Sequence, residues 1–430
     1  MNTNKTICLL NDSFPPLIDG VANAVMNYAR CLPDSGLAPL VLTPQHPEAD
    51  DSALPYPVIR YPSIDLREKT GYLAGVPFSP EIASRLEGRD VAVLHSHCPI
   101  VSTLLGRKLR QIVDAPLVLT YHTKFDIDIA NVIRFRALQE GSKRVLLENI
   151  NACDEVWTVS QGAGENLRSL GFAGDYIVMP NGVDLPRQRV SGEAVREATM
   201  GYDLPGGLPV FLFVGRIMWY KGLRLLLDAL ARLAATGEDF RMVFVGQGTD
   251  LEAVQAYARE RNLENKCVFT GPQRDREVLR AWYCRASLFL FPSTFDTNGL
   301  VVREAAACGL PSVLIGGSCA AEGVTHGVNG FLVEENAESL FRLLSTVGNR
   351  PEILRSVGEN AASQLYISWE EAVKAAAARY EIVVDRYRSG ACPRHRKPME
   401  YFLKANGELM EDLGHLVHLR EEIRRHRKER

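Results

Sequence analysis

The feature that most constrains the fold of this chain is a repeated alternation of short apolar runs with stretches of helical periodicity. Runs such as VFLFV (Val210–Val214) have hydrophobic residues at successive positions, which is typical of strands buried on both faces of a parallel sheet. Helical stretches such as Val21–Leu32 separate these runs and predict the α/β class. The expected strands are Thr6–Asn11, Pro39–Pro44, Val58–Tyr61, Val91–His95, Leu117–His122, Glu155–Ser160, Tyr176–Pro180, Val210–Val214, Arg241–Val245, Val268–Thr270, Leu288–Phe291, Ser312–Ile315 and Gly330–Val333.

Composition narrows the class of protein. At 430 residues the chain is long for one domain, so two domains are expected. A net charge of −3 gives no indication of a nucleic-acid partner. No apolar run is long enough to span a bilayer, and the N-terminus has no signal-peptide pattern. The nine cysteines are scattered, with neither metal-ligand nor disulfide spacing, which predicts a reducing cytoplasm.

The segment Phe291–Gly309 (FPSTFDTNGLVVREAAACG) contains the most informative local pattern. A strand ends there, a polar loop follows, and a helix begins after Gly299. Free N–H groups at a helix start suit an anion, and Asp296 and Glu304 can accept hydrogen bonds from sugar hydroxyls. A nucleotide sugar needs both an anion site for its phosphates and hydrogen-bond acceptors for its hydroxyls. The alternative is an ordinary strand–helix connection with solvated acids.

A second pattern follows the strand Val210–Val214, where Gly215-Arg216-Ile217 precedes Lys221-Gly222 at a helix start. An arginine can bind two phosphate oxygens in a fork, and a lysine adds a compact charge. These cations would stabilise a departing diphosphate more in the transition state than in the ground state. Solvated loop charges are the alternative.

The first half has its own candidate residues. Its opening strand, loop and helix resemble a nucleotide-type unit but lack G-x-G-x-x-G, so a nicotinamide dehydrogenase is not expected. Because ligands of parallel sheets gather at the carboxyl ends of the strands, His95, His97 and His122 are expected at a cleft, His122 above all. His95 and His97 as metal ligands are a weaker alternative, since no acidic partner is visible.

Together, D-x₇-E from Asp296 to Glu304 and the Arg216/Lys221 pair resemble the donor motifs of glycosyltransferase family 4. This family has the GT-B fold, with two Rossmann-like parallel-sheet domains facing a cleft and a C-terminal helix crossing back to the first domain. The usual first acid is Glu rather than Asp296, and the position of Asn298 more often holds an aromatic or aliphatic residue. Both departures bear on the donor sugar more than on the reaction.

The resemblance implies a domain layout and residue roles. We expect an acceptor domain over 1–185, a nucleotide-sugar domain over 186–368, a crossover helix over 369–390, and a cationic helical extension over 391–430. The residues expected to act in catalysis are His122, Asp296, Arg216 and Lys221. The residues expected to bind the donor are Gly20, Arg216, Lys221, Gln273, Asp296, Asn298, Gly299, Leu300 and Glu304. The family implies no cofactor and no metal, because cationic side chains hold the diphosphate.

The segment Lys124–Asn151 mixes an apolar stripe with cations, which suits a helix on an anionic membrane or one packed on its own domain. The tetrapeptide SHCP followed by TYHT is most similar to the branch of the family that glycosylates diacylglycerol or phosphatidylinositol. The expected partners are therefore a nucleotide sugar, a lipid acceptor and an anionic membrane surface.

The expected function is retaining transfer of a hexose, with UDP-glucose favoured, to an acceptor hydroxyl such as that of diacylglycerol. This predicts an enzyme of glycolipid biosynthesis on the inner face of the cell membrane. The alternatives are a sugar-nucleotide epimerase or a phosphorylase, and a non-catalytic sugar-nucleotide-binding protein. An epimerase would act on UDP-glucose without an acceptor, whereas a binding protein would hold the donor and transfer nothing.

Overall fold

The computed structural model describes residues 5–65, 73–77, 80–86, 88–123 and 136–392. The first part of the expected membrane segment (124–135) and nearly all of the expected extension (393–430) therefore lie outside the described residues. The chain divides into two compact units. Unit 1 comprises Met1–Val159, Ala163–Pro180 and Trp369–Arg430, and unit 2 comprises Ser160–Gly162 and Asn181–Ser368.

Unit 1 contains, within the described residues, a seven-stranded parallel sheet in the order β3-β2-β1-β6-β7-β8-β9. Its strands are β1 (Thr6–Leu10), β2 (Ala38–Pro44), β3 (Val58–Tyr61), β6 (Val91–Ser96), β7 (Leu117–Tyr121), β8 (Glu155–Thr158) and β9 (Ile177–Val178). A separate antiparallel hairpin pairs β4 (Ser63–Asp65) with β5 (Leu73–Gly75). The sequence patterns did not predict this hairpin.

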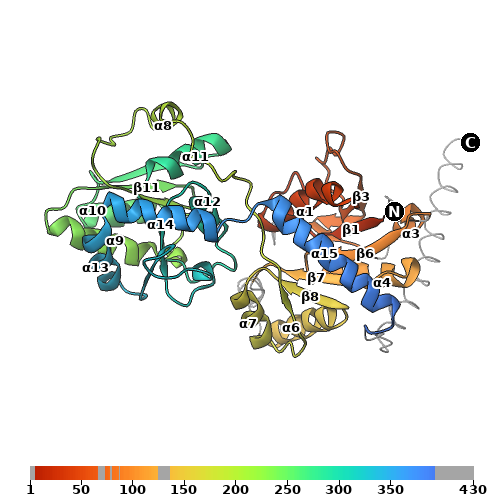
Figure 1. Ribbon diagram of the computed structural model, residues 1–430. Coiled ribbons are helices and arrows are strands. Elements are labelled where there is room, and N and C mark those ends of the chain that lie inside the picture. Colours follow the sequence, from red (N-terminus) through yellow and green to blue (C-terminus); the bar gives the residue numbers. More distant parts are fainter. Residues whose placement is uncertain (1–4, 66–72, 78–79, 87, 124–135, 393–430) are drawn as a thin grey trace, which may run out of the picture. The chain divides into compact units, whose positions relative to one another are not determined.

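Helices flank the unit 1 sheet (Figure 1). They are α1 (Gly20–Cys31), the 3₁₀ helix η1 (Leu32–Ser35), α3 (Pro80–Leu86), α4 (Val101–Val113), α6 (Arg136–Asn151), α7 (Gln161–Ser169) and α15 (Trp369–Arg388). The expected helix over Lys124–Asn151 is thus described only from Arg136. No helix within the described residues combines the length and hydropathy needed to cross a bilayer.

Unit 2 contains, within its described residues, a six-stranded parallel sheet in the order β12-β11-β10-β13-β14-β15. Its strands are β10 (Val210–Val214), β11 (Arg241–Val245), β12 (Cys267–Gly271), β13 (Leu288–Phe291), β14 (Ser312–Ile315) and β15 (Phe331–Val333). Its helices are α8 (Gly192–Ala198), η2 (Trp219–Lys221), α9 (Leu223–Ala235), α10 (Leu251–Glu260), α11 (Arg276–Arg285), α12 (Leu300–Ala307), η3 (Cys319–Ala321), α13 (Ala337–Val347) and α14 (Pro351–Gln364).

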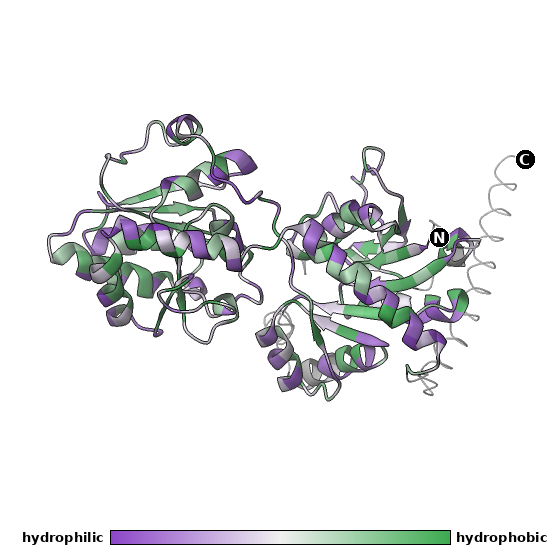
Figure 2. Cartoon of the chain, in the orientation of Figure 1, coloured by the Kyte–Doolittle hydropathy of each residue, from purple (hydrophilic) through white to green (hydrophobic). Residues whose placement is uncertain are grey.

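Each unit has its own hydrophobic core, built from the strands and the helix faces turned toward them. The central strands are coloured as hydrophobic, whereas α14 and α15 alternate hydrophobic and hydrophilic residues (Figure 2). β10 is buried at every position. This explains why an uninterrupted apolar run was a reliable strand signal.

The last helix, α15, belongs to unit 1 although unit 2 precedes it in the sequence. Its Trp369 ring contacts Tyr28 edge to face at 6.1 Å, and its Tyr380 ring stacks on Trp157 at 5.2 Å. Arg379 donates two hydrogen bonds, of 2.8 and 2.6 Å, to the buried Glu155 carboxylate. A return of the chain to the first domain, as expected from the family resemblance, is therefore observed.

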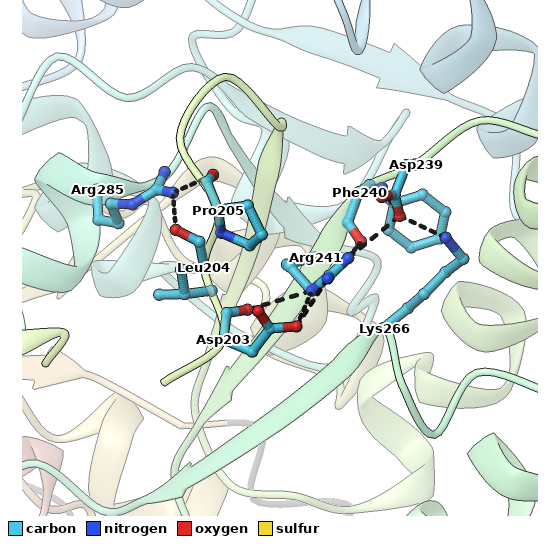
Figure 3. A network of polar contacts seen from close by, with 8 residues as sticks. All are labelled: Asp203, Leu204, Pro205, Asp239, Phe240, Arg241, Lys266 and Arg285. Atoms are coloured by element: carbon cyan, nitrogen blue, oxygen red, sulfur yellow. Dashed lines mark hydrogen bonds and ion pairs between the residues drawn. The ribbon is translucent and has the colours of Figure 1, made fainter. Parts of the chain in front are cut away.

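The polar connection after the first half is more ordered than its composition indicated. It includes α8, whose N-cap Ser191 accepts a hydrogen bond of 3.2 Å from Ala194 N–H. Its later part, Asp203 to Pro205, is held beside the strands of unit 2 by the polar contacts shown in Figure 3. There Arg241 forms ion pairs with Asp203 at 2.7 Å and Asp239 at 3.1 Å. Arg285 donates to the two carbonyls that follow Asp203.

Candidate active site

The candidate site in unit 2 lies at the carboxyl edge of its sheet, where all strands of a parallel sheet end together. β10 is hydrogen-bonded to β11 on one side and to β13 on the other. The chain leaves β10 toward one side of the sheet and later returns on the other, so this is the switch point where open α/β sheets bind ligands. The loops Gly215–Gly222 and Pro292–Gly299 follow β10 and β13 and lie at this point.

The two loops are held together through Gly222. This residue has φ +76°, and a Cβ there would lie 2.3 Å from the Pro292 carbonyl oxygen. Only glycine permits both the left-handed conformation and this approach of one backbone to the other. The contact places Lys221, the last residue of η2, beside the loop that contains Asp296.

Lys221 and Asp296 form a largely buried ion pair, with Nζ 2.6 Å from Oδ1. The ammonium also lies 5.5 to 5.8 Å from the ring centres of Tyr220, Phe291 and Phe295. Burial lowers the pKa of Lys221, and the Asp296 carboxylate opposes that shift. Since an ammonium has three donors, the pair leaves Lys221 with hydrogen-bonding capacity for a ligand.

Arg216 is exposed on the same loop as Lys221. Among the described residues, its guanidinium makes no hydrogen bond or ion pair, so it is free to bind an anion. Its charge is near enough to contribute to the lowered pKa of Lys221. The structure thus brings the two expected clamp cations into one loop.

Beyond Asp296 the loop presents polar atoms without partners. Asp296 Oδ2 and both amide atoms of Asn298 are buried and make no hydrogen bond to any described residue. Gly299 follows with φ +56° and begins α12, and a Cβ there would lie 2.9 Å from the Ala320 Cβ. Buried polar atoms normally have partners, so this edge has the chemistry of a site for a polar ligand.

Glu304 lies on α12, four residues after Leu300 begins that helix, and is 9% exposed. Its Oε1 accepts a hydrogen bond of 2.8 Å from Arg276 Nη2, and its Oε2 accepts one of 2.8 Å from the buried Tyr283 hydroxyl. Binding of sugar hydroxyls by Glu304, as expected from the sequence, would therefore require Arg276 to move or to share the carboxylate. Sequence reasoning missed Arg276 and Tyr283, because nothing in their spacing points to α12.

Gln273 follows β12 and therefore lies at the same edge as the other donor residues. Its Nε2 donates a long hydrogen bond of 3.4 Å to the Thr270 carbonyl. This weak contact leaves the side chain able to turn toward a ligand.

Gly20 and His122 belong to unit 1 and lie at the carboxyl edge of its own sheet. Gly20 is the first residue of α1, and a Cβ there would meet nothing within 4 Å. The Asp19 carboxylate already accepts the Val21 and Ala22 N–H groups at 2.9 and 2.7 Å. The start of α1 is therefore capped by a side chain rather than left open for an anion.

His122 is one of three buried histidines at the ends of β6 and β7. The ring nitrogens of His95 contact Tyr380 Oη at 2.6 Å and Thr120 Oγ1 at 2.7 Å. His95 is thus engaged in the attachment of α15, which contradicts its interpretation as a metal ligand. Among the described residues, no group of three or more His, Cys, Asp or Glu side chains is arranged to hold a metal ion.

Two parallel-sheet units, with cations and acids gathered at one switch point, define a glycosyltransferase of the GT-B class. Two family models match the chain: "Glycosyltransferase Family 4" over residues 18–187 and "Glycosyl transferases group 1" over residues 198–364. The chain belongs to glycosyltransferase family 4, and it is an enzyme of the glycosyltransferase type.

Several known proteins are similar to this chain. A D-inositol 3-phosphate glycosyltransferase of Xylanimonas cellulosilytica is 30% identical over 281 residues, which span 61% of this chain and 65% of that protein. An alpha-monoglucosyldiacylglycerol synthase of Acholeplasma laidlawii is 24% identical over 368 residues, or 83% of this chain and 91% of that protein. The crystal structure of Anabaena Alr3699/HepE in complex with UDP superposes with a TM-score of 0.70 at 19% identity, covering 88% and 100% of the two chains.

Proposed function

We propose that this glycosyltransferase moves a hexose from a nucleotide-diphosphate sugar, with UDP-glucose favoured, to a lipid hydroxyl such as that of diacylglycerol, with retention of configuration. The observation that carries the proposal is the Lys221–Asp296 pair at the switch point, beside polar atoms that lack partners. A cation and a hydrogen-bonding acid on adjacent loops match a donor with a diphosphate at one end and a hexose at the other.

In the proposed mechanism, Arg216 and Lys221 hold the diphosphate. As the bond from the anomeric carbon to the phosphate oxygen breaks, negative charge grows on that oxygen, and both cations stabilise it. In this mechanism, the side chains of Arg216 and Lys221 supply the compensating positive charge. Asp296 binds hexose hydroxyls through its unpartnered Oδ2, with Asn298, Gly299 and Leu300 completing that part of the loop.

The nucleoside and the sugar's other face have proposed partners too. Glu304 binds the ribose hydroxyls after exchange with Arg276, and Gln273 lies against the nucleobase. Gly20 and His122 face the hexose. The acceptor oxygen attacks from the face that the phosphate leaves, and the acceptor's proton passes to the departing phosphate oxygen. One carbon–oxygen bond breaks and one forms, so no covalent intermediate with the protein is needed.

Support for a lipid acceptor comes from the similarity to the Acholeplasma laidlawii protein, which is named an alpha-monoglucosyldiacylglycerol synthase. The two sequence motifs SHCP and TYHT are consistent with that branch. We propose accordingly that the enzyme works at the cytoplasmic face of the membrane and contacts anionic lipid. Sedimentation with anionic vesicles at low salt tests this, and a failure to co-sediment would contradict it.

The reaction is tested by offering UDP-glucose, UDP-galactose, UDP-N-acetylglucosamine and GDP-mannose with diacylglycerol, phosphatidylinositol or inositol phosphate. Transfer with a retained anomeric configuration is expected for one pair. The variant Arg216→Ala should lower kcat/KM by about 100- to 1,000-fold, the usual effect of losing one charge donor at a reacting centre. Arg259→Ala, which removes an exposed arginine from α10, is the matched control. Equal activity of the two variants would refute the clamp.

A further inference from the structure

Three buried histidines of unit 1, His95, His97 and His122, contact one another in series. The His95 and His97 rings have centroids 4.1 Å apart, and the His97 and His122 rings stack at 5.2 Å with planes 24° apart. His97 Nδ1 lies 3.0 Å from His122 Nε2, which is a hydrogen-bonding distance. His97 is 1% exposed and His122 is 6% exposed, so water does not compete for this bond.

Both members of this pair are neutral at ordinary pH. Burial lowers the pKa of His97 well below its usual value, and burial lowers the pKa of His122 to about 3. A neutral imidazole has one N–H and one bare nitrogen. A hydrogen bond between two neutral rings therefore links their tautomers, because one nitrogen must donate and the other must accept.

The remaining nitrogen of His97 decides between the two arrangements. His97 Nε2 is buried and has no hydrogen-bond partner among the described residues, and the Tyr28 and His97 rings meet in a T-shaped contact with centroids 5.2 Å apart. If His122 were the donor, the proton of His97 would lie on Nε2 as a buried N–H without an acceptor. If His97 instead donates from Nδ1, its Nε2 carries no proton and is only an unused acceptor. Buried N–H donors without partners are rarer in proteins than buried acceptors without partners, so the second arrangement is favoured.

We propose that His97 is a positioning residue that fixes both the tautomer and the orientation of His122. His97 Nδ1–H donates to His122 Nε2, which places the proton of His122 on Nδ1. His122 is then a fixed hydrogen-bond donor rather than a base. Its use toward the hexose rests on the function proposed above, whereas the tautomer itself does not.

His95 supports this arrangement from the other side. Both of its ring nitrogens are engaged, by Tyr380 on α15 and Thr120 on β7, so its ring cannot turn. The His97 ring packs against this immobile His95 ring. Tyr380 on α15 thus contacts this histidine cluster through His95.

The direct test is nitrogen NMR of the full chain labelled with [¹⁵N]histidine, with His122 assigned from a His122→Asn sample. We expect His122 to show a protonated Nδ1 and a bare Nε2 without any sugar nucleotide present. A His122 signal with a protonated Nε2 would overturn the proposal. This measurement needs no activity, so it stands whether or not the proposed reaction is found.

Two variants of His97 separate positioning from packing. In His97→Asn the amide nitrogen overlies Nδ1 and can still donate to His122, whereas in His97→Gln the amide overlies Nε2 and cannot. We expect the Asn variant to keep the His122 tautomer and a kcat within about threefold of the wild type. The Gln variant should lose the tautomer and lower kcat by about tenfold or more, with KM changed less, the scale of lost supporting contacts around a functional ligand.

His95→Asn is the control, because it removes one hydrogen bond of the cluster but leaves the His97–His122 contact in place. It should keep the His122 tautomer. Circular dichroism establishes that each variant is folded before it is compared. Equal behaviour of the Asn and Gln variants at position 97 would refute the proposal, and if neither folds, the wild-type tautomer alone decides it.

Discussion

Lowering the pH should destabilise unit 1 by an amount that follows from its buried histidines. His95, His97 and His122 are neutral when folded, because burial lowers the pKa of each below the unfolded value of 6.5. Below that value the unfolded state binds protons that the folded state does not, so stability falls as pH falls. At about pH 5.5, one unit below 6.5, each histidine costs about 1.4 kcal/mol, and the three together cost about 4 kcal/mol.

One buried acid acts in the opposite direction. Burial raises the pKa of Asp12 despite its hydrogen bonds to the start of α4. A raised folded pKa favours the folded state as pH falls, so Asp12 offsets part of the loss. The net loss between about pH 7.5 and 5.5 should therefore be smaller than about 4 kcal/mol, against the roughly 5–15 kcal/mol of stability typical of a domain.

Hydrogen exchange read by mass spectrometry measures this loss within unit 1. The opening free energy of β6 and β7 peptides should fall over that pH range, by up to about 4 kcal/mol, after correction for intrinsic exchange rates. Peptides from β10 and β13 are the internal control, because the one histidine described in unit 2, His326, is exposed. A loss below about 1 kcal/mol in β6 and β7, or an equal loss in both units, would refute the reasoning.

Three further perturbations test the unit 2 site. Asp296→Asn leaves the buried Lys221 ammonium without its carboxylate, so the pKa of Lys221 should fall further. The loss of UDP binding at alkaline pH, followed by calorimetry, should then begin at a lower pH, and an unmoved profile would contradict this. Gly222→Ala should cost at least about 1–2 kcal/mol in a thermal melt, because alanine is strained at φ +76°. Tyr283→Phe removes a hydrogen bond to Glu304 and should raise the donor KM about tenfold with kcat unchanged, and a matching fall in kcat would argue against ribose binding.

The sheets were largely predictable because their strands are buried on both faces. The ranges expected for β10, β11, β13 and β14 coincide with those observed, since each is a continuous apolar run that ends near glycine, proline or a charge. The GT-B class and the family were also predicted correctly. In contrast, α8 was missed, because its signal is a single Ser191 cap within a polar stretch rather than an apolar stripe.

Side-chain partnerships were the least predictable part. The Arg276–Glu304–Tyr283 group depends on how α11 packs beside α12, and no residue spacing encodes that distance. His95 was expected at a cleft, but one of its ring nitrogens is hydrogen-bonded to Tyr380, which lies nearly three hundred positions later in the sequence. Strand alternation does place His95 and His97 on one face, so their contact could have been anticipated. The roles of the site residues themselves stay predictions.

The return of α15 to unit 1 has a consequence for synthesis on the ribosome. Domains usually fold in the order in which they emerge, yet unit 1 includes α15, which is synthesised after the whole of unit 2. Until then the nascent chain carries Tyr28 without Trp369, and Glu155 without the guanidinium of Arg379. Residues 181–368 can mature in the meantime. The N-terminal half therefore lacks the contacts that α15 provides until residues 369–388 have been synthesised.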